Sequence, residues 1–327
     1  MNPSEMNLSE LKNAAIIALR DCMGLQTDET LLIISDEMKR EIGLVLHQEG
    51  KKLCKESIYV EIKSREINGQ EPPVAVAELM KMVDVVVCPT DKSLTHTNAR
   101  RDAAAKGVRV GTMPGITIET MIRCLNADYN KIVALTDFIV EKLQGVEKIR
   151  VVTQKGTDIT MPIKGRKILP SKGVLRQKGE SGNLPSGEVY LAPIEDQSNG
   201  VVVIDGSMAG IGLLTEPIVI EVVNGYAEKI SGGKQAEQLI ATLDKVGRDA
   251  RAVAEFGIGT NYKAQLCGEI LEDEKVYGTI HIAFGNNLSM GGKISVPLHL
   301  DGLVTEPDVY FDDRLVMTGG KILGFEI

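Results

Sequence analysis

The sequence predicts an α/β N-terminal domain with a mostly parallel sheet, followed by a β-rich α+β C-terminal domain. Three observations support this prediction. The chain has 327 residues, which is more than one compact core usually supports. Its 33 glycines divide unevenly, with 8 in residues 1–150 and 25 in residues 151–327. Helical and strand patterns alternate in the first part, whereas strand patterns dominate the second. We therefore predict two domains, 1–148 and 149–327.

The elements of the first domain follow one another as helix then strand, four times over. The predicted elements cover residues 8–22, 30–35, 36–52, 58–62, 74–82, 83–88, 97–106 and 108–110. The strand runs are short and rich in β-branched residues, and Pro89 ends the third of them. Such strands, separated by helices, are typical of a parallel sheet that is covered on both faces.

The second domain carries strand patterns with Gly and Asn turns between them. The clearest strands are predicted at residues 151–153, 158–161, 201–205, 217–222 and 279–282. Apolar runs at 189–193 and 294–298 are also typical of strands. One helix is predicted, over residues 234–254.

Composition excludes several classes of function. The net charge is −8 and no run of Lys or Arg exceeds two residues, so we expect no nucleic-acid partner. No apolar stretch approaches the ~20 residues that span a bilayer, and the N-terminus resembles no secretory signal, so we expect a cytoplasmic protein without membrane contact. The five cysteines include no Cys-x-x-Cys pair, which favours reduced, packed thiols.

The segment after the third predicted strand is a candidate site in the first domain. It covers residues 89–97, is rich in hydroxyl groups and contains His96. Ligands often bind at the carboxyl ends of parallel strands, but Ser35-Asp36-Glu37 stands where a dinucleotide fold would carry its Gly-x-Gly-x-x-Gly turn. His96 either lines an active cleft or serves locally, by capping the following helix or packing against it.

His299-Leu300-Asp301 is the most informative motif of the second domain. If this segment is a strand, His299 and Asp301 point the same way, about 6 to 7 Å apart along the chain. The chain has only four histidines, and a second one, His281, lies in another apolar strand pattern. A single His in such a strand is more often a packed core residue than a metal ligand.

Two glutamates extend this set. Glu188 follows a turn and begins an apolar run, so a cation or a metal would have to balance its charge if it is buried. Glu255 is predicted at the end of the helix, before two glycines that would allow close backbone approach. Either glutamate alone could simply be solvated. Together with the two His and Asp301, they form a donor set suited to two divalent ions and a bridging water.

Four blocks of sequence resemble the thermophilic metallopeptidases of the aminopeptidase T and S type. They are Asn-Leu-Pro-Ser-Gly-Glu at 183–188, Glu-Phe-Gly-Ile-Gly-Thr-Asn at 255–261, Gly-Thr-Ile-His-Ile-Ala-Phe-Gly at 278–285 and His-Leu-Asp at 299–301. Residues 93–100 and Asp-Glu-Lys at 273–275 fit the same pattern. The resemblance implies a homodimer with two divalent ions (Zn, Co, Mn or Mg) in a cleft between domains. It implies as metal ligands Glu188, Glu255, His281, His299 and Asp301.

The resemblance predicts a metal-dependent aminopeptidase that removes N-terminal residues from peptides. Metal-activated water would attack the scissile carbonyl, with Glu255 or Glu188 as the proton shuttle and His96 as a further catalytic residue. Two features depart from the family. Leu288 stands where the peptidases carry a catalytic tyrosine, and the stretch between His281 and His299 is short.

Two alternatives use the same residues differently. The chain also resembles the 2,5-dihydroxypyridine dioxygenases, in which His281, His299 and Asp301 would hold one non-haem Fe(II) as a facial triad. His96 would then be the base for a small-molecule substrate. In the second alternative the chain is a non-catalytic binding protein whose acidic cluster is only structural, so that removing metal would leave ligand binding unchanged.

Overall fold

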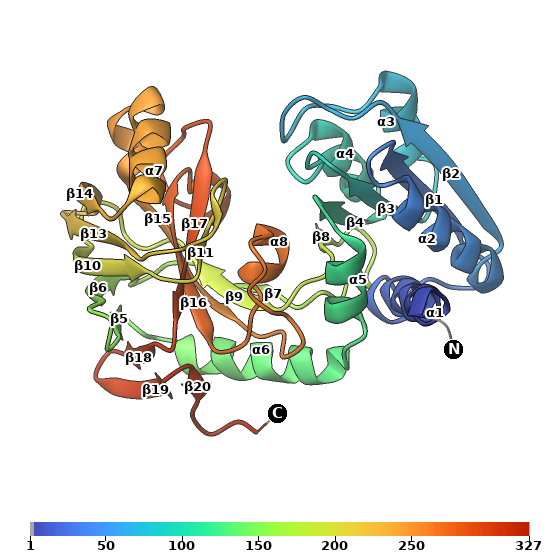
Figure 1. The fold of residues 1–327 in the computed structure, drawn as a ribbon. Coiled ribbons are helices and arrows are strands. Elements are labelled where there is room, and N and C mark those ends of the chain that lie inside the picture. Colours follow the sequence, from blue (N-terminus) through green and yellow to red (C-terminus); the bar gives the residue numbers. More distant parts are fainter. Residues whose placement is uncertain (1–2, 327) are drawn as a thin grey trace. The chain divides into compact units, whose positions relative to one another are not determined.

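The computed structural model describes residues 3–326 and divides into two units (Figure 1). The first unit reaches to Val133 and takes in Ser171–Ser186; the second covers Ala134–Pro170 and continues from Gly187. Helix α6 (Tyr129–Leu143) carries the chain from the first unit to the second. The domain boundary that we predicted near residue 148 stays a prediction.

The first unit is built on a five-stranded parallel sheet in the order β2-β1-β3-β4-β8. Its strands are β1 (Thr30–Asp36), β2 (Glu56–Ile62), β3 (Val85–Thr90), β4 (Arg109–Pro114) and β8 (Ser181–Asn183). Its helices are α1 (Pro3–Ile16), the π-helix Ile17–Cys22, α2 (Arg40–Leu53), α3 (Val74–Met80), α4 (Asn98–Ala105) and α5 (Ile118–Leu125). Every residue of β3 is buried, as expected of a parallel strand that is covered on both faces.

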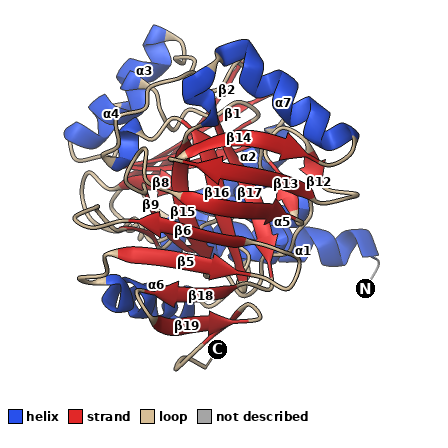
Figure 2. Cartoon of the chain, turned by 90° about the vertical axis from the view of Figure 1, so that its left-hand side faces the viewer, coloured by secondary structure: helices blue, strands red, loops and turns tan. Residues whose placement is uncertain are grey.

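The second unit contains two antiparallel sheets that contribute to one hydrophobic core (Figure 2). The eight-stranded sheet runs β14-β13-β10-β6-β5-β18-β19-β20 and the seven-stranded sheet runs β12-β11-β17-β16-β15-β9-β7. The bounds are β5 Lys148–Val152, β6 Asp158–Pro162, β7 Leu169–Ser171, β9 Glu188–Leu191, β10 Asn199–Ile204, β11 Ser207–Met208, β12 Gly212–Leu213, β13 Ile218–Val223, β14 Tyr226–Ser231, β15 Val253–Gly259, β16 Thr279–Gly285, β17 His299–Thr305, β18 Asp308–Phe311, β19 Arg314–Thr318 and β20 Lys321–Ile322. The predicted fold class of both parts is confirmed.

Helix α7 (Lys234–Val246) is shorter than the predicted helix over 234–254. Gly247, with φ of 108°, ends it, and a 3-10 turn (Arg248–Arg251) leads directly into β15. The placement of Glu255 at a helix end was therefore wrong, because this residue lies within a buried strand. A positive-φ glycine is a common helix stop, and the apolar residues that follow it belong to the strand.

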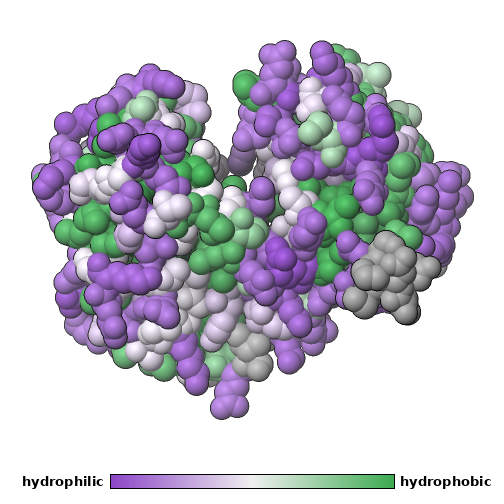
Figure 3. All heavy atoms as spheres, in the orientation of Figure 1, coloured by the Kyte–Doolittle hydropathy of each residue, from purple (hydrophilic) through white to green (hydrophobic). Residues whose placement is uncertain are grey.

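The run 294–298 was also predicted as a strand, but β17 begins only at His299. Pro297 lies in this run and cannot donate a backbone hydrogen bond, which weakens strand pairing there. Within residues 3–326, no helix combines the length and the apolar character needed to cross a bilayer. Hydrophilic side chains cover much of the face shown in Figure 3, with apolar ones between them.

Candidate metal centre

Four adjacent strands of the seven-stranded sheet carry the predicted ligands. β9 supplies Glu188, β15 supplies Glu255, β16 supplies His281, and β17 supplies His299 and Asp301. Figure 1 labels these four strands in the second unit. These strands pair in the order β9-β15-β16-β17, so side chains of one face can meet across them. The structure therefore brings together all five residues that the sequence analysis had singled out.

The strand register places a small residue opposite each candidate ligand. Glu188 pairs with Gly259, His281 with Gly257 and His299 with Gly285, while Ala283 faces both Glu255 and Asp301. Directly opposite residues of paired strands share one face of the sheet. Short side chains at the facing positions leave room for the imidazoles and carboxylates to converge.

Gly257 has a specific steric role. A Cβ atom on this residue would lie 2.0 Å from Nε2 of His281, so only glycine lets the imidazole lie across β15. At Gly259 a Cβ would lie 2.1 Å from the carbonyl oxygen of Val276. The two glycines after Glu255 thus allow the close approaches that the sequence predicted, one to a side chain and one to the backbone.

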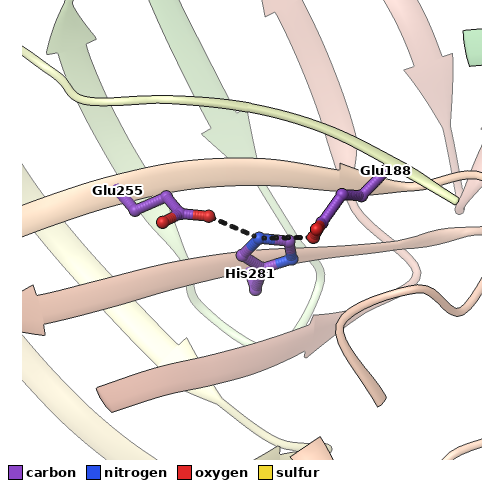
Figure 4. A group of neighbouring side chains, drawn as sticks. All are labelled: Glu188, Glu255 and His281. Atoms are coloured by element: carbon purple, nitrogen blue, oxygen red, sulfur yellow. Dashed lines mark hydrogen bonds and ion pairs between the residues drawn. The ribbon is translucent and has the colours of Figure 1, made fainter. Parts of the chain in front are cut away.

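Glu255 lies between the two imidazoles. Its Oε1 is 3.1 Å from Nε2 of His281 and its Oε2 is 3.2 Å from Nε2 of His299. His299 Nε2 lies 3.4 Å from Oδ1 of Asp301. Two groups of three therefore share Glu255: one with Glu188 and His281 (Figure 4), and one with His299 and Asp301.

The cluster is buried, and its charges stabilise one another. His281 is 0% exposed, and burial alone would lower its pKa, but its hydrogen bond to Glu255 and the nearby carboxylates raise the pKa to about 9. Burial would raise the pKa of Asp301, yet the charge of His299 holds it at about 2. Protonated imidazoles supply positive charge that the carboxylates require.

The donor set fits a divalent ion. Oδ1 of Asp301 is buried and makes no hydrogen bond to any described residue, although the imidazole of His299 is near. A buried carboxylate oxygen without a donor is costly, and a cation would satisfy it. Imidazole nitrogens and carboxylate oxygens are the ligands that Fe(II), Zn and Mn accept.

Glu188 differs from Glu255 and Asp301 because its cationic partner at hydrogen-bond distance is a lysine. Nζ of Lys275 lies 2.8 Å from Oε1 of Glu188 and also contacts Glu274, and this lysine is 0% exposed. Burial raises the pKa of Glu274 to about 8. The apolar setting of Glu188 predicted a cation or a metal beside it, but not that the cation is Lys275. The only signal was the Asp-Glu-Lys segment at 273–275.

His96 and Leu288 are not among the five candidate ligands. His96 is exposed, in the first unit, on the loop before α4. The N-cap of α4 is Thr97, whose side chain accepts a hydrogen bond from the Arg100 N–H, so His96 does not cap this helix. Leu288 lies in a 3-10 turn (Leu288–Met290), and its side chain is exposed.

Comparison with known proteins decides between the candidate families. The family model of 2,5-dihydroxypyridine 5,6-dioxygenase matches residues 44–324. The chain belongs to this family. A curated 2,5-dihydroxypyridine 5,6-dioxygenase of Pseudomonas putida is 25% identical over 197 residues, a match that spans 56% of this chain and 56% of that protein.

Two solved structures share the fold of this dioxygenase family member. The 2,5-dihydroxypyridine dioxygenase of Pseudomonas putida superimposes with a TM-score of 0.81 at 19% identity, covering 98% of this chain and 97% of that one. AmpT from Thermus thermophilus superimposes with a TM-score of 0.69 at 16% identity, covering 96% and 99%. At these identities, the likeness shows a common fold alone.

The prediction of a metallo-aminopeptidase, and with it the hydrolase class and the peptidase family, was wrong. The family match places the chain with 2,5-dihydroxypyridine 5,6-dioxygenases, and dioxygenases are oxidoreductases. The proton-shuttle roles predicted for Glu188 and Glu255 belonged to that peptidase mechanism. The expected pair of divalent ions came from the same resemblance and has no support from the dioxygenase family. In the sequence, Leu288 in place of the catalytic tyrosine was the feature that spoke against a peptidase.

Proposed function

We propose that this chain is a dioxygenase that opens the ring of a 2,5-dihydroxylated pyridine with a single Fe(II). The observation that carries the proposal is the family match over residues 44–324. The described cluster supports it, because its two groups of candidate ligands, Glu188-Glu255-His281 and Glu255-His299-Asp301, share Glu255 and supply the imidazole and carboxylate donors of which a facial triad is made. The match to the curated relative, at 25% identity, spans 56% of each chain, so the identity of the substrate is part of the proposal.

The ligands in this proposal are His281, His299 and Asp301. Bound Fe(II) supplies the redox chemistry of adding dioxygen to an aromatic ring, and a facial triad leaves coordination positions open for that purpose. Glu255 accepts from His281 at 3.1 Å and lies 3.2 Å from His299, so its carboxylate lies between the two Nε2 atoms and fixes both rings. Lys275 neutralises Glu188, which keeps that carboxylate out of the proposed ligand set.

We further propose that His96 is the base that removes a proton from a ring hydroxyl of the substrate. Imidazole is the side chain that most often serves as a general base. The residue lies on an exposed loop at the carboxyl end of β3, where side chains of parallel-sheet domains often serve as functional groups.

Turnover of two substrate classes tests the proposal. Protein reconstituted anaerobically with Fe(II) is mixed with oxygenated buffer and 2,5-dihydroxypyridine, while an electrode records oxygen and a spectrometer records ring absorbance. We expect equimolar loss of oxygen and of the pyridine. A parallel assay uses aminoacyl amides with Co, Zn or Mn, and we expect no hydrolysis. Amide hydrolysis without any oxygen uptake on hydroxypyridines would contradict the proposal.

A further inference from the structure

His299 has a fixed hydrogen bond on the side of its ring that faces away from the carboxylates. Its Nδ1 lies 2.7 Å from the carbonyl oxygen of Asn286, and a carbonyl can only accept, so Nδ1 carries the proton. Nε2 is thereby left to face Glu255 and Asp301. The Nδ1 of His281, in contrast, is buried without a hydrogen bond to any residue in the range 3–326.

The carbonyl of Asn286 belongs to the segment 286–298, which joins β16 to β17 and which we call the β16–β17 loop. The residue after it, Asn287, is 0% exposed. Its side-chain oxygen accepts from the N–H of Ile294 at 2.8 Å, and its amide group donates to Oε1 of Glu195 at 2.9 Å. A Cβ on Gly292 would collide with the Asn287 side chain at 2.1 Å, so the loop closes tightly around this amide.

Glu195 is the point to which the β16–β17 loop is attached. Its Oε1 also accepts from the backbone N–H of Lys293 at 2.7 Å, and its Oε2 pairs with the guanidinium of Arg166. Arg166 donates in addition to the carbonyl of Gly291 at 2.9 Å. Both side chains are largely buried, with exposed fractions of 8% for Glu195 and 14% for Arg166. This one carboxylate therefore holds the loop at two residues directly and at a third through its arginine.

We propose that Glu195 is a positioning residue of the metal centre: by holding Asn287 and the β16–β17 loop, it places the Asn286 carbonyl that orients His299. The inference rests on the proposed metal site. Hydrogen-bond partners of ligating imidazoles fix the ring orientation, and their loss commonly weakens metal binding about 10- to 100-fold. Glu195 acts through two intermediate residues, so its effect should fall at the lower end of that range.

The test compares Glu195→Gln with Asp205→Asn as a matched control. Asp205 is likewise a buried carboxylate, 3% exposed, that pairs with Lys155 and accepts from the N–H of Thr305 at 2.8 Å. Thr305 is the last residue of β17, at the opposite end from His299. Fe(II) and Co(II) affinities are measured by titration against a competing chelator. We expect about a tenfold weaker affinity in Glu195→Gln and a change within about twofold in Asp205→Asn.

A second measurement needs no metal. In ¹⁵N-histidine-labelled, metal-free protein, the Nδ1–H proton of His299 should give a hydrogen-bonded resonance in the wild type and in Asp205→Asn. It should be lost to solvent exchange in Glu195→Gln. Asn287→Ser removes the amide donor to Glu195 and serves as the test variant if Glu195→Gln does not fold.

The outcomes separate the two proposals. Unchanged metal affinity and an unchanged His299 resonance in the Glu195 and Asn287 variants overturn the inference, and so does an equal loss in Asp205→Asn. If the wild-type chain binds neither Fe(II) nor Co(II), the proposed function fails, while the resonance of the metal-free protein still decides the role of Glu195.

Discussion

At the scale of the residue, the space for the imidazole of His281 depends on the missing side chain of Gly257. In Gly257→Ala the new Cβ would sit 2.0 Å from Nε2 of His281, so the ring has to move away from Glu255. We expect metal affinity to fall by at least about tenfold. Overpacking should cost about 1–3 kcal/mol of unfolding free energy.

The control for Gly257→Ala is another strand glycine, Gly182, where a Cβ would meet only the Leu175 side chain at 3.3 Å. Isothermal titration with Co(II) and chemical denaturation measure both variants. Wild-type metal affinity in Gly257→Ala would show that His281 is not a ligand or that its ring has room elsewhere.

Glu188 and Asp301 are both buried acids of the cluster, but they should respond differently to loss of charge. Glu188→Gln should retain one metal ion per chain, because Lys275 already pairs with this carboxylate at 2.8 Å. The Glu188→Gln variant should still be less stable, by about 3–5 kcal/mol, because the buried ammonium of Lys275 loses a partner.

Asp301→Asn, in contrast, should lose the metal. Metal analysis of the two purified variants checks this, and joint loss of metal would return Glu188 to the ligand set.

At the scale of the element, the sequence allowed the prediction of the strands but not of every boundary. β9 and β16 were recognised from their apolar runs, and the shared face of His299 and Asp301 follows from strand alternation. Glu255 was misplaced on a helix because the apolar residues after Gly247 suit helix and strand periods equally. Lys275 and Glu195 were missed as neighbours of the site because their partners are distant in sequence.

The stability that Glu195 contributes by holding the β16–β17 loop should depend on pH. Burial would raise the pKa of this carboxyl, but its own backbone N–H, the N–H of Lys293 and the side chains of Asn287 and Arg166 hold the pKa below its ordinary value. A lowered pKa stabilises the fold above about pH 4.3, the unfolded value, and this contribution is lost as the pH falls through the folded pKa. The difference in stability between wild type and Glu195→Gln should therefore shrink as denaturation is measured from pH 7 toward pH 3. A constant difference over that range would contradict the assignment.

At the scale of the whole molecule, the two-part fold class followed from sequence pattern, whereas the function did not. The same five positions are compatible with a dinuclear hydrolase and with a mononuclear iron site, so only Leu288 and the short stretch between the histidines favoured the second. The family match over residues 44–324 supplied what the residues alone left open. The homodimer stays a prediction, which sedimentation of the purified chain would measure.

His96, the proposed base, belongs to the first unit, whereas the proposed metal ligands belong to the second. His96→Gln should lower kcat on 2,5-dihydroxypyridine by about 10²- to 10⁴-fold, the usual contribution of a general base. Metal content should not change, because the proposed ligands all belong to the second unit. His47→Gln, on α2 of the same unit, is the matched control and should keep full activity. Undiminished turnover in His96→Gln would remove this residue from the mechanism.

The central claim is that the chain is a dioxygenase and not a hydrolase, and the source of the oxygen in its product tests it most directly. Fe(II)-loaded protein is incubated with 2,5-dihydroxypyridine under ¹⁸O₂ in unlabelled water. The reaction is quenched rapidly, and mass spectrometry determines how many ¹⁸O atoms the product contains. The account predicts that both atoms of the labelled dioxygen enter the opened ring. A product whose new oxygen comes only from water would contradict it.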